Sequence, residues 1–323
     1  MRRLIVRRAL TGVVMVFVVA TLAFVLLHLA PGDPLAVTLD RPYVTPAVRA
    51  AWRHTYGLDR PLGAQYLLYL RDLARGDLGY SFSLRRPVAA ALAVALPRTL
   101  LLMSLALAVS FVGGVAVGLF QARRHGSPAD HAAGGVMLAF YSVPDFWLAI
   151  IMMLVFAYWL PFFPTSGMVD PVIHPYLGFW GRMRDLGTHL VLPVATLALL
   201  SAAAISRFQR AAALDVSRQD YVRTARAKGV PERSVFLRHI LRNALLPVIT
   251  LLGLAFPALL GGSVFVEQVF AWPGMGYLTV NAVAARDYPL VTAVVVVGSA
   301  LVVVGNLLAD LLYAWVDPRL RTS

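Results

Sequence analysis

The chain has 323 residues, of which 59% are hydrophobic and only 14% are charged, and its mean hydropathy is +0.72. Soluble globular domains are usually about 45–50% apolar and about 25% charged, so this composition argues against a water-soluble enzyme. It also excludes a disordered chain, which needs low hydrophobicity and high charge. The net charge of +13 lies in the gaps between apolar stretches, as in membrane proteins rather than nucleic-acid-binding ones. Because there is no Cys, disulfides, cysteine-based zinc sites and thiol nucleophiles are excluded.

Six long apolar segments predict six membrane-spanning helices, because a helix needs about 20 apolar residues to cross a core of about 30 Å. The first resembles a signal peptide, but its apolar run is too long and Pro31 follows directly, so we expect a retained helix. Gly114 and Gly118 in the second form a pair of small residues that favours close helix packing. The six segments are Ala9–Ala30, Leu100–Phe120, Gly134–Leu160, Leu190–Ser206, Ala244–Val266 and Leu290–Val316.

The basic loops predict the orientation, since short cytoplasmic loops carry an excess of Lys and Arg. Four Arg precede the first span, Arg123 and Arg124 follow the second, and Arg207–Arg242 holds nine basic residues. By contrast, residues 161–189 hold two Arg and residues 267–289 hold one. We therefore expect both chain termini on the cytoplasmic side.

The segment after the first span contains a predicted amphipathic helix. Leu62, Tyr66, Leu70 and Leu73 recur at helical spacing between a proline and a glycine. Such a helix suits the outer membrane surface, either packed over the ends of the spans or available to a partner.

The loop between the fourth and fifth spans reads as two short helices joined by a glycine turn. Ser217 and Asp220 resemble a capping box, and a helical run continues to Lys228. Gly229 supplies a left-handed end, and Pro231 suits the first turn of a second helix.

The first of these helices has features of a protein contact. Thr224, Ala225 and Ala227 are small, and Tyr221, Ala225 and Lys228 share one face by helical spacing. A short helix of this kind suits a groove on a cytoplasmic partner. The alternative is that the basic residues only hold the loop inside the cell and against anionic lipid.

At these residues the sequence resembles the "EAA" loop of bacterial ABC importer permeases, and more narrowly the dipeptide/oligopeptide/nickel permease family in its DppB/OppB-type subunits. The resemblance covers nearly the whole chain. Its motifs are Ala30–Pro34, Tyr56–Pro61, Gly76–Gly79, Tyr221–Gly229 with Leu245–Pro247, Glu267–Gly274, Arg286–Pro289 and Asp317–Arg319.

The resemblance implies a type-1 (MetI-like) ABC transporter bundle with a coupling helix that docks on a cytoplasmic ATPase. Arg223, Thr224, Ala225 and Gly229 occupy the motif positions, with Arg-Thr where the general motif begins Glu-Ala. The same resemblance implies four partners: a second homologous permease, two ATPase subunits that bind ATP and Mg²⁺, and an extracytoplasmic substrate-binding protein. It implies import of di- or oligopeptides or related small solutes through the bacterial inner membrane.

We expect three segments along the chain. Residues 1–94 would form the first span plus an extracytoplasmic segment. Residues 95–316 would form the transmembrane domain, with the coupling loop at 207–243, and residues 317–323 would form a cytoplasmic tail.

The sequence offers no chemistry of its own. There is no phosphate-binding loop of the form G-x-x-x-x-G-K-[ST], and Lys228 is the single Lys in the chain. Neither H-E-x-x-H nor G-x-S-x-G occurs. We therefore expect no catalytic, cofactor-binding or metal site, and no ATP hydrolysis by this chain.

Two carboxylates lie near the predicted spans and call for an explanation. Inserting a charged side chain at the centre of a membrane span costs about 2.5–3.5 kcal/mol. Asp145 follows Pro144 and either balances the dipole at a helix start or lines a polar path. The resembling family usually has Ser there, so Asp145 would favour cationic solute groups. Glu267 either partners a helix end or contributes to the path.

Two other classes of protein are open on the sequence. A secondary transporter or channel would work without an ATPase and should show inverted repeats or paired intramembrane charges, which are not evident. An intramembrane hydrolase would need a Ser-His or Asp-Asp pair at depth, and no such pair is evident.

Overall fold

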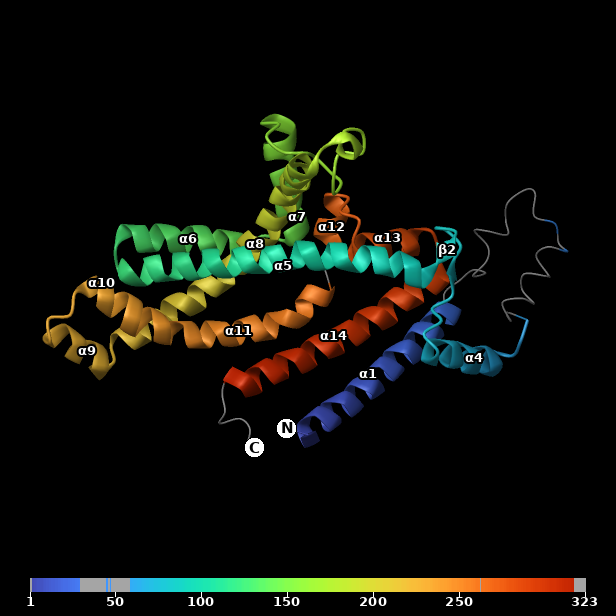
Figure 1. The fold of residues 1–323 in the computed structure, drawn as a ribbon, viewed down its shortest axis with the longest axis horizontal. Helices are drawn as coiled ribbons and strands as arrows, with labels where there is room; N and C mark the ends of the chain where they lie inside the picture. Colours follow the sequence, from blue (N-terminus) through green and yellow to red (C-terminus); the bar gives the residue numbers. More distant parts are fainter. Residues whose placement is uncertain (1, 30–44, 46, 48–58, 262, 317–323) are drawn as a thin grey trace.

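The computed structural model describes residues 2–29, 45, 47, 59–261 and 263–316, and it is almost entirely helical (Figure 1). The helices before the long loop are α1 (Arg2–Leu29), α4 (Leu62–Ala74), α5 (Val88–Arg123), α6 (Pro128–Ser142), α7 (Asp145–Met153) with the π-helical η1 (Leu154–Trp159), the 3₁₀ turn η2 (His174–Tyr176) and α8 (Phe179–Ser217). They are followed by α9 (Asp220–Ala227), α10 (Glu232–Ser234), the π-helical η3 (Val235–Leu241), α11 (Arg242–Gly261), α12 (Val264–Val269), α13 (Met275–Ala284) and α14 (Tyr288–Val316).

The core of the fold is the long contact between α5 and α8. A Cβ atom on Gly114 would lie 2.7 Å from Cβ of Ile205, and one on Gly118 would lie 2.5 Å from the carbonyl oxygen of Ser206. The two glycines therefore let the backbones approach closely, which confirms the packing role predicted for this pair.

A second layer is formed by α1, α14 and α11. α14 packs between α1 and α11, and α11 also contacts α8 and α5 (Figure 1). Gly12 of α1 lies directly against Val303 of α14, where a Cβ would overlap the valine side chain. The outward face of α1 exposes large apolar side chains such as Phe17 and Leu26, as expected for a helix facing lipid.

The predicted spans are confirmed in part. Within the described residues, Arg8–Leu29, Val88–Arg123, Phe179–Ser217 and Tyr288–Ala309 are long and apolar enough to cross a membrane, which makes four spans. A bent pair of helices makes a fifth if it is counted as one span. α11 covers most of the fifth apolar segment of the sequence. Counted together with the four spans and the bent pair, it makes six crossings compatible with this structure.

The predicted third span, Gly134–Leu160, is not one straight helix. α6 ends at Ser142, α7 begins at Asp145, and the two are bent by 106°. Val143 and Pro144 both have extended backbones, because proline lacks an N–H and disfavours the helical region for the residue before it. The predicted third span is therefore a sharply bent pair of helices, and the helix start expected at Asp145 is confirmed.

The end of the molecule opposite α9 and α10 carries α4 and a short hairpin (Figure 1). α4 confirms the predicted amphipathic helix, and its Tyr66 hydroxyl lies 2.7 Å from Thr21 of α1. The hairpin pairs β1 (Tyr80–Ser81) with β2 (Arg86–Pro87) in antiparallel register. Buried Asp287, from the motif before α14, accepts hydrogen bonds from the hydroxyls of Ser81 and Ser83.

Some motifs lie outside the described residues. These are Ala30–Pro34, the first three residues of the Tyr56–Pro61 motif, and the predicted tail at 317–323 with Asp317–Arg319.

Candidate functional site

The first helix of the candidate coupling loop begins later than the sequence suggested. α8 runs through Ser217, whose hydroxyl donates to the carbonyl of Leu214 inside that helix. Ser217 is therefore not a helix cap, and the prediction of a capping box there was wrong. The cap position of α9 is Gln219, whose carbonyl accepts from the backbone N–H groups of Val222 and Arg223.

The end of α9 is the turn that the sequence predicts. Gly229 has a φ of +75°, its N–H bonds to the carbonyl of Arg226, and the N–H of Val230 bonds to the carbonyl of Ala225. This pair of bonds is a Schellman motif, and Val230 also packs against the cluster that contains Ala225. The glycine turn is therefore confirmed, with its hydrophobic contact.

The inward face of α9 carries Val222 and Ala225, which are 0% and 7% exposed. Both belong to an apolar cluster that joins α9 to its neighbours, and its other buried members are Ala213 of α8, Val235 and Ile240 of η3, and Ala244 of α11. The prediction that Ala225 lies on a contact face with Tyr221 and Lys228 was wrong. Sequence spacing alone left the phase of this short helix ambiguous.

The outward face of α9 is mainly polar, with the exposed ring of Tyr221 at its start. Arg223, Thr224, Ala227 and Lys228 are exposed and follow one another at helical spacing, and Tyr221 is exposed beside them. Arg223 makes only a long contact of 3.7 Å with Asp220, in which both side chains face solvent. The structure therefore presents a small, positively charged helix face at one end of the molecule (Figure 1).

A clamp closes the loop on itself. The guanidinium of Arg226 donates to both carboxylate oxygens of Glu232, at 3.1 and 2.8 Å. The hydrogen bond from Arg226 is the main reason that the pKa of Glu232 lies below its ordinary value. The clamp ties α9 to α10 across the glycine turn.

Glu267, the second candidate path residue, lies in a network of buried hydrogen bonds rather than at the end of a span. Its carboxylate accepts from the hydroxyl of Thr99 at 2.8 Å and from the N–H groups of Gly276 and Tyr277 at 2.7 and 3.1 Å. It is 0% exposed and sits at the N-terminus of α13, where backbone N–H groups favour an anion.

The rest of the Glu267–Gly274 motif belongs to the same buried network. The indole of Trp272 is fully buried and donates to the carbonyl of Arg98. A Cβ on Gly274 would fall within 2.6 Å of the Glu267 carboxylate, so only glycine fits there. The motif therefore joins α12, α13 and α5, and a path role for Glu267 stays a prediction.

Asp145 is the first residue of α7, immediately after the bend. Its carboxylate accepts from the N–H of Phe146 at 2.8 Å, as expected for an acidic residue at a helix start. The Phe146 ring lies 6.0 Å from that of Phe265, next to α12. The side chain is only partly buried, and its role in a path stays a prediction.

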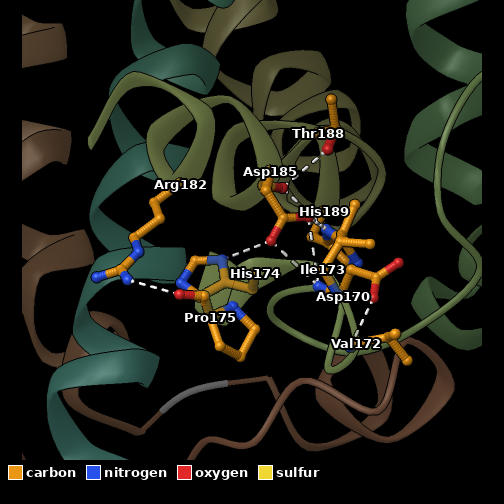
Figure 2. A network of polar contacts seen from close by, with 9 residues as sticks. All are labelled: Asp170, Val172, Ile173, His174, Pro175, Arg182, Asp185, Thr188 and His189. Carbon is orange, nitrogen blue, oxygen red and sulfur yellow. Dashed lines mark hydrogen bonds and ion pairs between the residues drawn. The ribbon is translucent and has the colours of Figure 1, made fainter. Parts of the chain in front are cut away.

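Sequence reasoning missed one polar cluster. Asp185 in α8 lies 2.6 Å from Nδ1 of His174 and 3.2 Å from Nδ1 of His189, and it also accepts from the N–H of Asp170 (Figure 2). The spacing of Asp185 and His189, four residues apart, was the one available signal. This network fixes the loop between η1 and α8.

Comparisons with known proteins agree with this arrangement. The family described as "Binding-protein-dependent transport system inner membrane component" matches residues 114–322, and its N-terminal counterpart matches residues 1–104. The chain is 40% identical over 318 residues to the oligopeptide transport system permease protein AppB of Bacillus subtilis, with 98% of each chain covered. It is 40% identical to the di/tripeptide transport system permease protein DppB of Pseudomonas aeruginosa and 37% identical to the dipeptide transport system permease protein DppB of Escherichia coli, each with 94% of both chains covered.

The long apolar helices agree with the family match, which makes the chain an integral membrane component of a transport system. The chain belongs to the family of binding-protein-dependent transport system inner membrane components, the permeases of ABC importers. In the described part of the chain, no three His, Asp or Glu side chains are grouped to hold a metal ion.

Proposed function

We propose that the chain is a pore-forming subunit of an ATP-driven importer of di- or oligopeptides. The similarity to peptide permeases over the whole chain supports the substrate class. The absence of a phosphate-binding loop from the sequence agrees with ATP hydrolysis by separate subunits. In this proposal both termini are cytoplasmic, residues 1–94 form the first span and an outer segment, residues 95–316 form the transmembrane domain, and residues 317–323 form a tail.

The observation that carries the proposal is the outward face of α9. It is small, cationic and exposed, while the opposite face is anchored to α8, η3 and α11 through the apolar cluster. A force applied to α9 would therefore pass to two long helices rather than bend a loose loop. We propose that the loop at 207–243 docks on a cytoplasmic ATPase through this face.

The remaining partners follow from the same family. We propose a second homologous permease that completes the pore, two ATPase subunits that bind ATP and Mg²⁺, and an extracytoplasmic binding protein that delivers the solute. Alternating access would follow from closure of the ATPases, which draws the coupling helices together.

The docking proposal is tested by enlarging the outward face. We expect Ala227→Trp to leave the chain folded, because Ala227 is exposed, and to remove the ATPase subunits from the purified complex. Ala284→Trp, an exposed alanine on α13 at the other end of the molecule, is the matched control and should retain them. Retention of the ATPases by both variants would contradict the docking face. Uptake that continues without the ATPases would favour the secondary transporter.

The path proposal concerns Asp145. If its carboxylate lines the route of the solute, Asp145→Ser should reduce uptake of a cationic dipeptide more than uptake of a neutral dipeptide of similar size. The ratio of the two uptake rates is the measurement. An equal loss for both solutes would mean that Asp145 acts only at the start of α7.

A further inference from the structure

A cavity of about 380 Å³ lies between the ends of α5, α6 and α8 that are nearest the coupling loop. Its lining includes Arg207 and Arg210 of α8, Gln121 of α5, and His131, Gly134 and Leu138 of α6. None of these residues lies on the outward face of α9, through which the ATPase is proposed to dock.

The cavity has a positive charge that its own acidic residue does not balance. Arg210 is paired with Asp130, through bonds of 2.9 and 2.7 Å, and the Asp130 side chain is 4% exposed. Arg207 makes no ion pair within the part of the chain that the structure describes. Its guanidinium lies 5.6 Å from the centre of the Tyr141 ring. The charges of Arg210 and Asp130 therefore cancel, and Arg207 supplies the net positive charge of the cavity.

A buried polar group faces the same cavity. Gln121 is 3% exposed, and its Oε1 has no hydrogen-bond partner among the described residues. Its side chain reaches toward α6, since a Cβ on Gly134 would lie 3.3 Å from Nε2. An unpaired buried carbonyl is costly, so a ligand with a hydrogen-bond donor would be favoured at this position.

The surroundings of the cavity are those of a membrane surface. Leu138 in its wall and Tyr141 one turn further along α6 are exposed on the outside of the bundle. Arg123 and Arg124 lie at the adjoining end of α5. Basic pockets between spanning helices on the cytoplasmic side are typical binding sites for anionic lipid headgroups.

We propose that this cavity binds the headgroup of phosphatidylglycerol from the inner leaflet. The phosphate would pair with Arg207, and an acyl chain would leave along the exposed side of α6. A rotation of the Gln121 side chain would present its buried Oε1 to a headgroup hydroxyl as an acceptor. Phosphatidylethanolamine fits less well, because its ammonium group would be repelled by Arg207. The placement in the inner leaflet rests on the orientation given under Proposed function, but binding itself needs neither ATPase nor transport.

The test is native mass spectrometry of the purified, delipidated full-length chain, titrated with short-chain phosphatidylglycerol or phosphatidylethanolamine. We expect phosphatidylglycerol to bind about tenfold more tightly, and Arg207→Gln to abolish that preference. Arg124→Gln is the matched control, since Arg124 also lies over an aromatic ring, that of Phe120, but does not line the cavity.

A glycine pair tests the cavity itself. Gly134→Ala would place a methyl group against Gln121 inside the cavity, whereas Gly135→Ala would meet nothing within 4 Å. We expect only the first to weaken lipid binding. Equal affinity for the two lipids, an unchanged preference in Arg207→Gln, or wild-type lipid affinity in Gly134→Ala would overturn the proposal. Glycerol phosphate binding as tightly as the lipid would overturn the lipid assignment in favour of a soluble anion.

Discussion

At the scale of single residues, the backbone conformation was easier to predict from the sequence than the burial of a side chain. The left-handed turn at Gly229 was predicted correctly because glycine is the residue that adopts a positive φ at little cost. Ser217 and Ala225 were misplaced, because the first depends on where α8 ends and the second on which side of α9 faces the bundle. Those two facts are set by packing between helices.

Glu267 gives the prediction at this scale. Its replacement in Glu267→Ala would leave the hydroxyl of Thr99 and two buried N–H groups without their acceptor, and each such loss typically costs about 1–3 kcal/mol. We expect Glu267→Ala to lower the melting temperature of the purified chain strongly, and Glu267→Gln to lower it less, because the amide oxygen still accepts from a backbone N–H. Gln268→Ala, at an exposed neighbour, is the control. Wild-type stability in Glu267→Ala would refute a stabilising role for this buried hydrogen-bond network.

Elements were predicted best where long apolar runs or strong turn signals define them. α5, α8, α14 and α4 appear at the expected positions, although α5 and α8 extend well beyond their apolar segments. A helix start after Pro144 was predicted, but the bend of 106° between α6 and α7 was not, because a proline in an apolar run is compatible with a kink as well as with a complete break. The motif Glu267–Gly274 was recognised as a pattern, but its contact with Thr99 joins residues far apart in the chain and is invisible to local reasoning.

The clamp between Arg226 and Glu232 predicts a pH dependence of the coupling loop. The pKa of Glu232 is lower in the folded chain than in the unfolded one. Its contribution to the free energy of unfolding is therefore fully present above the unfolded pKa of about 4.3, and it is lost as the pH falls through the folded pKa. Both side chains face solvent, so the effect is small, typically below about 1 kcal/mol.

The measurement is the difference in melting temperature between wild type and Arg226→Gln at pH 7 and at about pH 3. We expect a small difference at the higher pH that becomes smaller at the lower one, because Glu232 is increasingly protonated as the pH falls. Arg223→Gln, which removes only a long exposed contact, should show no difference at either pH. A difference for Arg226→Gln that is undiminished in acid would rule out the ion pair as its cause.

At the scale of the whole molecule, the sequence predicted an all-helical membrane bundle, and the composition and apolar runs were sufficient for this. The arrangement of the ends of the molecule could not be predicted from the sequence: α9 lies at one end of the fold, and α4 and the hairpin lie at the other (Figure 1). Loop charge alone predicted which end faces the cytoplasm. The bundle thus has the proposed docking face of α9 at one end and a hydrogen-bonded polar loop before α8.

The most direct test of the account is the accessibility of a single thiol on the outward face of α9. The natural chain has no Cys, so Thr224→Cys introduces one reactive group, and Tyr80→Cys provides an exposed control on the hairpin at the other end. A membrane-impermeant maleimide should label Thr224→Cys only from the cytoplasmic side, and assembly with the ATPase subunits should block that labelling while Tyr80→Cys reacts only from outside. Labelling of Thr224→Cys from the outside, or labelling that assembly leaves unchanged, would contradict the account.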